Sequence, residues 1–177
     1  MKKFPAILLT ILLLALSMPA LAENSEWSID EAKSLLTAYT GAGGDVTVPD
    51  KIGSAAVKTL DTGVLAQVSG MTKLTLPEGV LHIMDNACSW NPDLVQLSLP
   101  QSLMIIGGNG FNDCDKLESV TIPAGVRYIG NGAFSDSELL KSVTFEGVCS
   151  VFDGVRSQSI TATPSIWLFP KPLAALW

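Results

Sequence analysis

The chain has 177 residues, enough for one domain, and a net charge of −6 with only 11 lysines and arginines. This acidic balance excludes nucleic acid and anionic membrane surfaces as expected partners, because both require basic patches. His82 is the single histidine, which excludes a metal site built from several histidines.

Residues 1–22 are predicted to be a secretory signal peptide. Lys2 and Lys3 form a positive start, an almost wholly apolar segment follows over 6–16, and Ala20-Leu21-Ala22 is a small-x-small cleavage site. We expect Sec-type export with cleavage after Ala22, no membrane insertion of the mature chain, and a secreted or cell-surface location, with the periplasm as the alternative. Pro19 disfavours an uncleaved membrane anchor, because it interrupts the apolar segment where a spanning helix would continue.

Residues 23–45 are predicted to form an N-terminal capping helix and a turn. Ser28 and Glu31 match a capping box, in which a hydroxyl and a carboxylate three residues later satisfy the first backbone N–H groups of a helix. The helix is expected to run to about Tyr39 and to stop at Gly41. Its apolar positions follow helical spacing: Ile29, Ala32, Leu35, Leu36 and Tyr39.

A 23-residue repeat occupies the segment 46–154. The aligned positions include Val80, Leu103 and Val126, and also Ile83, Ile106 and Ile129. One rung of this length cannot bury its own apolar face, so the rungs must stack. The predicted fold is therefore mostly β, a leucine-rich-repeat-like solenoid of about four rungs, whose first rung carries a five-residue insertion with Gly53 in its loop.

Each rung contains a short strand in which polar and apolar residues alternate. The segments are KLTLP (73–77), QLSLP (96–100), SVTIP (119–123) and SVTFE (142–146). Their apolar residues are expected to point inward, and the following proline ends the strand in three of the four. The outward positions are small and polar, and they form a candidate binding face of Thr75, Ser98, Thr121, Thr144 and the neighbouring Gln96. Threonine and serine also simply suit an exposed strand, which is the structural alternative.

A second candidate contact surface is partly apolar. His82, Ile105 and Tyr128 occupy equivalent positions of successive rungs, and Trp90 is predicted to project from a turn where later rungs carry Asp113 and Asp136. Isolated exposed apolar residues are also ordinary on protein surfaces. Asp113, Asp115 and Asp136 do not follow a known calcium-loop spacing, so they are interpreted as solvated turn residues.

Three cysteines, Cys88, Cys114 and Cys149, are interpreted as buried structural residues. Their spacings in the sequence differ from the repeat length, so no two are expected to be vertically aligned, and an odd number leaves at least one thiol unpaired. Residues 155–177 match no rung. This non-repeat tail is either a C-terminal cap, with Ile166, Trp167, Leu168 and Phe169 covering the last rung, or the end of a truncated array.

The stretch LESVTIPAGVRYIGNGAFSDSELLKSVTFEG (117–147) resembles the BspA-type leucine-rich repeat, and the rungs at 73–94 and 96–117 are similar to it. Cys114 occupies the cysteine position of that repeat, whereas Asn91 and Ser137 replace the cysteine in neighbouring rungs. The resemblance implies a curved solenoid on a bacterial surface or in bacterial secretions, with adhesion or binding of other proteins as its role.

These observations predict an exported, non-catalytic binding or adhesion module. Its repeat face would contact an extracellular protein or glycan, and no cofactor, metal site or catalytic residue is expected. Two alternatives remain open: a secreted parallel β-helix enzyme acting on polysaccharide, and a truncated paralogue without a function of its own. The enzyme alternative needs a cleft lined with carboxylates or arginines, but the chain has only Arg127 and Arg156.

Overall fold

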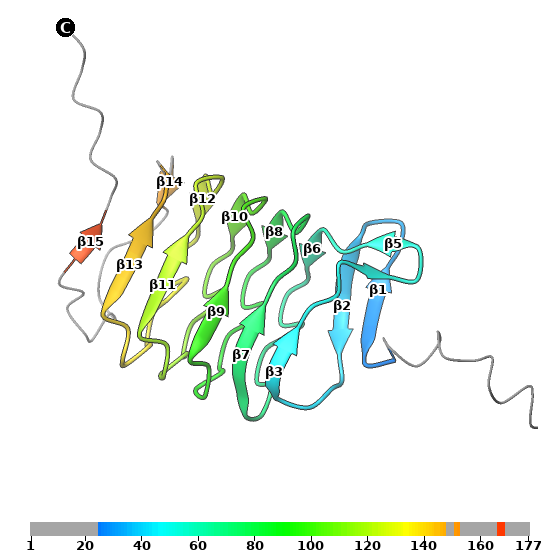
Figure 1. The fold of residues 1–177 in the computed structure, drawn as a ribbon, viewed down its shortest axis with the longest axis horizontal. Coiled ribbons are helices and arrows are strands. Elements are labelled where there is room, and N and C mark those ends of the chain that lie inside the picture. The colour runs from blue at the N-terminus through cyan, green and yellow to red at the C-terminus, as the bar shows by residue number, and fades with distance from the viewer. Residues whose placement is uncertain (1–24, 148–150, 153–165, 169–177) are drawn as a thin grey trace, which may run out of the picture.

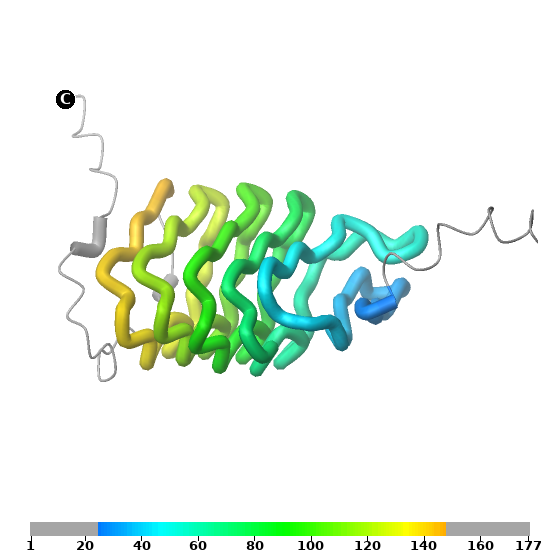
Figure 2. Tube along the Cα trace, turned by 60° about the horizontal axis from the view of Figure 1, so that its bottom comes forward, coloured from blue at the N-terminus to red at the C-terminus, as the bar shows by residue number. Residues whose placement is uncertain are grey.

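The computed structural model describes residues 25–147, 151–152 and 166–168. This part of the chain contains fifteen strands and no helix. The strands follow a coil in which successive turns lie side by side along the long axis of the molecule (Figures 1 and 2). The predicted signal peptide at 1–22 lies outside the described residues.

One side of the solenoid is a seven-stranded sheet in the order β1-β2-β6-β8-β10-β12-β14. From β2 onward its neighbours are parallel, and from β6 onward the paired residues follow the repeat, as in Ile83↔Ile106↔Ile129. Five strands from β6 to β14 therefore stack as successive turns, more than the four rungs expected from the sequence. The strands are β1 (Trp27–Asp30), β2 (Leu35–Tyr39), β6 (Thr59–Leu60), β8 (His82–Ile83), β10 (Ile105–Ile106), β12 (Tyr128–Ile129) and β14 (Val151–Phe152).

The other side carries the alternating strands that the sequence predicts, in two three-stranded sheets. One has the order β3-β7-β9 and the other β11-β13-β15, and no strand pairing joins β9 to β11. Next to this interruption Leu97 and Leu99 are only partly buried, whereas their counterparts Leu74 and Val120 are buried. The strands are β3 (Gly44–Thr47), β7 (Met71–Thr75), β9 (Gln96–Ser98), β11 (Ser119–Ile122), β13 (Ser142–Phe145) and β15 (Ile166–Leu168).

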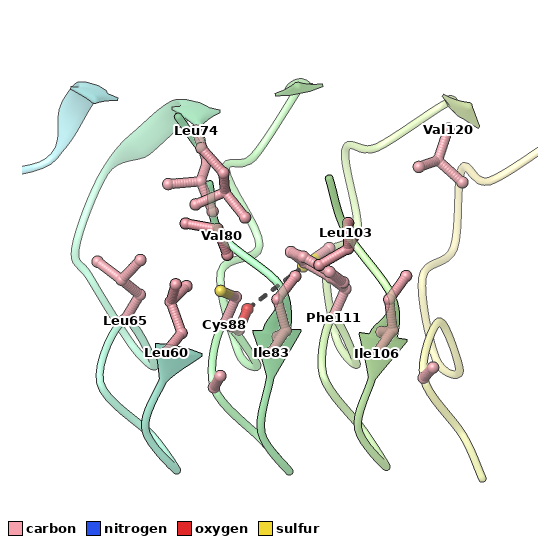
Figure 3. Packing of buried hydrophobic residues seen from close by; sticks show 14 of the residues in the cluster. Leu60, Leu65, Leu74, Val80, Ile83, Cys88, Leu103, Ile106, Phe111 and Val120 are labelled. Atoms are coloured by element: carbon pink, nitrogen blue, oxygen red, sulfur yellow. Dashed lines mark hydrogen bonds between the residues drawn. The ribbon is translucent and has the colours of Figure 1, made fainter. Parts of the chain in front are cut away.

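The core lies between these two sides and consists of files of equivalent residues. Val80, Leu103 and Val126 are 0%, 0% and 2% exposed, as stacking of the rungs requires (Figure 3). Phe111 and Phe134 stack with ring centroids 5.5 Å apart and an interplanar angle of 8°. Each turn thus hides the apolar side chains of its neighbours, and fully burying one such side chain contributes about 1.5–3 kcal/mol.

The predicted capping helix is wrong, because its residues form an antiparallel hairpin of β1 and β2. Trp27 is buried and packs on Tyr39 with ring centroids 4.2 Å apart. β2 pairs in parallel with β6, so it supplies hydrogen-bond partners to the first repeat strand, which a helix could not do. Asp30, not Ser28, organises the local turn, since its carboxylate accepts from the backbone N–H and the ammonium group of Lys33.

The five-residue insertion in the first rung forms a hairpin of its own. Its strands β4 (Lys51–Ile52) and β5 (Ala55–Ala56) are antiparallel. Gly53 lies in the connecting turn with φ of +61°, a conformation that favours glycine.

In the segment predicted as a non-repeat tail, residues 166–168 form β15. This strand pairs in parallel with β13 through Ser142↔Ile166 and Thr144↔Leu168, a spacing one residue longer than the repeat, which the 23-residue pattern does not detect. Trp167 of the expected cap is within the described backbone, whereas Phe169 lies outside the described residues.

Candidate binding surfaces

The candidate binding face predicted from the sequence is a row of hydroxyl side chains on the outward positions of the strands. Thr75 pairs with Ser98 in one sheet, and Thr121 pairs with Thr144 in the other. Ser98 and Thr121 are exposed, and Thr75 and Thr144 are half-buried. Neighbouring strands in a sheet lie about 4.8 Å apart, so each pair presents two hydroxyls at that spacing.

This hydroxyl row consists of two segments, because β9 and β11 are not paired. The first segment is Thr47, Thr75 and Ser98, and the second begins at Thr121. Gln96 is exposed beside Ser98 and pairs with Lys73. The predicted residues are therefore on one side of the solenoid, but their regular register stops between the third and fourth strands.

Ion pairs between successive rungs lie just before the strands of this face. The ammonium group of Lys116 is 2.8 Å from the Asp93 carboxylate, and that of Lys141 is 3.1 Å from the Glu118 carboxylate. All four side chains are exposed, so each pair contributes only about 0–1 kcal/mol to stability. Their effect on the surface is to balance charge beside the hydroxyl row.

The structure brings His82, Ile105 and Tyr128 into one file on the outer face of the seven-stranded sheet. All three side chains are half-buried, and Leu81 and Met104 precede the first two. Met84 is 41% exposed in the same turn as His82. Trp90 belongs to a different part of the surface, since it lies in the loop between β8 and β9.

That loop repeats a particular backbone conformation in successive turns. Gln67, Trp90, Asp113 and Asp136 occupy equivalent positions of four rungs, and all have positive φ between 54° and 56°. Backbone hydrogen bonds also connect these loops, as when Trp90 N–H donates to the Asn112 carbonyl at 2.8 Å. The sequence identified the alignment of this file but not its left-handed conformation.

Carboxylates cluster beside Trp90. Burial raises the pKa of Asp113, and the neighbouring Asp136 and Asp115 raise it further, while a hydrogen-bonding interaction with the Trp90 side chain opposes the rise. Burial also raises the pKa of Asp115, together with Glu138 and Asp136. Within the described ranges, no group of three or more histidine, cysteine, aspartate or glutamate residues is arranged to hold a metal ion.

Cys88 and Cys114 are buried and free, as expected for structural residues. Burial raises the pKa of the Cys88 thiol well above its usual value and that of Cys114 to about 12, so neither is a thiolate at neutral pH. The spacing argument missed their proximity, because the Cys114 Sγ donates to the Cys88 carbonyl over 3.8 Å (Figure 3). Cys149 lies outside the described residues.

A buried polar file was also missed, and it explains the departures from the cysteine position. Asn91 Oδ1 accepts from Val68 N–H at 2.9 Å, and Ser137 Oγ accepts from Cys114 N–H at 3.2 Å. The Cys114 sulfur accepts a hydrogen bond from the backbone of Asn91, which partly opposes the rise of its pKa. Asparagine, cysteine and serine are thus equivalent here, since each accepts from the backbone N–H one rung earlier.

The geometry defines a class of protein, the leucine-rich-repeat solenoids with one short strand per side in each turn. The BspA type leucine rich repeat region family matches residues 51–161 in six copies, so the chain belongs to this family. Comparison with curated proteins gave no match. Among the described residues, no helix is long and apolar enough to span a membrane.

Solved structures support the same fold. A leucine-rich repeat protein of T. pallidum is similar at 24% identity with a TM-score of 0.66, covering 75% of this chain and 62% of that one. A leucine rich cell surface protein of Faecalibacterium prausnitzii is similar at 20% identity with a TM-score of 0.56, covering 62% of this chain and 28% of that one. The chain thus spans less than two thirds of either protein, and these likenesses concern the fold alone.

Proposed function

We propose that this chain is an exported, non-catalytic binding module whose hydroxyl row contacts an extracellular protein or glycan. The observation that carries the proposal is the paired register of Thr75 with Ser98 and of Thr121 with Thr144 on an exposed face. Side chains presented in register by a rigid stack form an extended surface, which solenoids use to bind partners.

Two further points support a surface location. The family to which the chain belongs is the BspA type, and the structural relative from Faecalibacterium prausnitzii is described as a cell surface protein. The apolar segment at 6–16 and the Ala20-Leu21-Ala22 site are the features that would direct export. Mass spectrometry of the secreted protein tests this part, with a mature chain beginning at Glu23 as the expected result.

The polysaccharide-enzyme alternative receives no support from the family match. A general base would need an oriented nucleophile and a carboxylate at hydrogen-bonding distance. His82, the one histidine, lies instead in a file with Ile105 and Tyr128. We therefore assign the surface to binding and propose no reaction.

A binding screen of residues 23–177 against extracellular-matrix proteins, mucin and bacterial glycans tests the proposal. In the protein with both Ser98→Glu and Thr121→Glu, we expect at least tenfold weaker binding to any ligand found, because two charges then interrupt the row. Ser54→Glu is the matched control, since Ser54 is equally exposed in the β4–β5 turn. Undiminished binding by the double variant would remove the hydroxyl row from the site, and a screen without any ligand would favour the paralogue without a function of its own.

A further inference from the structure

Trp90 is an outlier among the described residues in both conformation and exposure. Its φ is +56°, and its side chain is 47% exposed. Left-handed backbone is unfavourable for a bulky residue by about 1–2 kcal/mol, and it is tolerated most readily by glycine, asparagine and aspartate. The equivalent position in the next two rungs holds aspartate, in Asp113 and Asp136.

The packing of the core does not account for this residue. Buried Cys88 and Ser89 precede Trp90 and buried Asn91 follows it, whereas the indole is directed to solvent and is not part of the hydrophobic core. A strained and exposed aromatic residue that adds little to the core is evidence for a functional role.

The surroundings of the ring supply hydrogen-bonding groups in the adjacent turns. The Asp113 side chain interacts with the Trp90 side chain, which restrains the orientation of the indole. Asp136 Oδ2 accepts from the Asn112 amide at 3.0 Å, so this carboxylate is also held in place. Gln67 is exposed at the equivalent position one rung earlier.

An exposed, restrained indole beside carboxylate and amide groups has the chemistry of a sugar platform. The flat apolar face of a pyranose ring stacks on an aromatic ring, and its hydroxyls donate to carboxylates, which are strong acceptors. We propose that Trp90, with Gln67 and Asp113 on either side, binds a neutral glycan. This inference rests on the proposed binding function and adds a second site, separate from the hydroxyl row.

The charges around Trp90 decide between classes of ligand. Asp113, Asp115, Asp136 and Glu138 repel one another, and they would also repel sulfated or sialylated glycans. The file holds Gln67 and aspartates instead of the apolar residues that surround a protein hot spot. Ion pairs at exposed positions contribute only about 0–1 kcal/mol, so a basic peptide would gain little from the carboxylates.

The substitution Trp90→Asp tests the proposal, because it installs the residue that the next two rungs carry in the same backbone conformation. We expect the melting temperature of residues 23–177 to stay the same or rise, because strain is relieved. We expect affinity for neutral oligosaccharides, measured by isothermal calorimetry with manno-, xylo- and chito-oligosaccharides, to fall at least tenfold. Trp90→Phe, which keeps an aromatic ring, should retain part of the affinity.

Val95→Asp is the matched control, since Val95 is 49% exposed in the same rung but lies outside the Trp90 file. A lowered melting temperature in Trp90→Asp would make Trp90 structural, and undiminished binding would place the sugar elsewhere. Wild-type protein that binds no neutral oligosaccharide, or that prefers a lysine-rich peptide in a salt-sensitive manner, also overturns the proposal. None of these outcomes affects the hydroxyl row, whose failure appears only in the Ser98→Glu and Thr121→Glu variant.

Discussion

The side chain of Asn91 holds the rung before it, because its Oδ1 accepts a 2.9 Å hydrogen bond from the backbone N–H of Val68. Its amide nitrogen donates to the carbonyls of Leu65 at 2.9 Å and Cys88 at 2.8 Å. Asn91 is fully buried, so each of these bonds satisfies a group that water cannot reach. One side chain therefore joins two rungs at a point where the loops have no regular strand pairing.

Asn91→Ala should destabilise the protein strongly. The change leaves the Val68 N–H and two carbonyls without their partner inside the core, and one such buried group costs about 1–3 kcal/mol. We expect a loss of at least about 2 kcal/mol in the free energy of unfolding, measured by urea denaturation. Asn91→Ser should lose less, because Ser137 fills the same role in a later rung.

Asn131→Ala is the control for this comparison, since Asn131 is exposed in the turn after β12. Its stability should differ from wild type by less than about 0.5 kcal/mol. Equal losses at Asn91 and Asn131 would contradict the role assigned to the buried amide.

Gly130→Ala should also be destabilising, for a steric reason. An added Cβ at Gly130 would lie 2.4 Å from the backbone nitrogen of Gly108, and backbone atoms cannot move away without separating the rungs. We expect a loss of at least about 2 kcal/mol by urea denaturation.

The matched variant for that prediction is Gly108→Ala, whose added Cβ would come no closer than 3.3 Å to another atom. It should lose clearly less stability than Gly130→Ala. A reversed order would mean that the rungs separate more easily than their hydrogen-bond register indicates.

Alkaline pH should unfold the protein partly through Cys114. Burial raises the pKa of this thiol to about 12, whereas an unfolded cysteine ionises near pH 9. Between these values the folded state retains a proton that the unfolded state has lost, so stability falls as the pH rises, by up to about 1.4 kcal/mol per pH unit. The loss begins near pH 9, and below that pH the contribution of the thiol is constant.

Cys114→Ser removes this titration and retains a hydroxyl that the same position uses in Ser137. Urea denaturation at pH 8 and pH 10.5 should therefore show a smaller pH-dependent loss in the variant than in wild type. Identical losses would show that other groups cause the alkaline sensitivity.

Trp27→Ala should destabilise the N-terminal hairpin. Trp27 is buried against Tyr39, and removing a buried aromatic side chain costs about 3–5 kcal/mol when the site does not collapse. We expect faster amide hydrogen exchange first in β1 and β2, with β10 and β12 least affected. Uniformly faster exchange in all strands would show instead that the hairpin and the repeats unfold as one unit.

The repeat could be predicted from the sequence because stacking requires similar residues at a fixed interval. The buried file of Val80, Leu103 and Val126 follows directly from the 23-residue spacing. The N-terminal hairpin could not be predicted in this way, since Ile29, Leu36 and Tyr39 also fit the period of a helix. What decides between the two is the open edge of β6, a tertiary partner that local spacing does not contain.

The candidate sites show the same division. The hydroxyl row follows from alternation within each strand, so Thr75 and Ser98 were correctly placed together. The role of Asn91 could not be read from its identity, because only its hydrogen bonds show that an amide, a thiol and a hydroxyl are equivalent there. The strain at Trp90 was hidden for a similar reason, as a sequence carries no φ angle.

The equivalence of Asn91, Cys114 and Ser137 has an evolutionary consequence. Since each uses the same backbone N–H of the preceding turn, a whole 23-residue unit can be duplicated or deleted while every junction keeps its hydrogen bonds. Proteins of this kind can therefore lengthen or shorten by genetic recombination in complete units, and the reach of their outer surface changes by one strand spacing at each event.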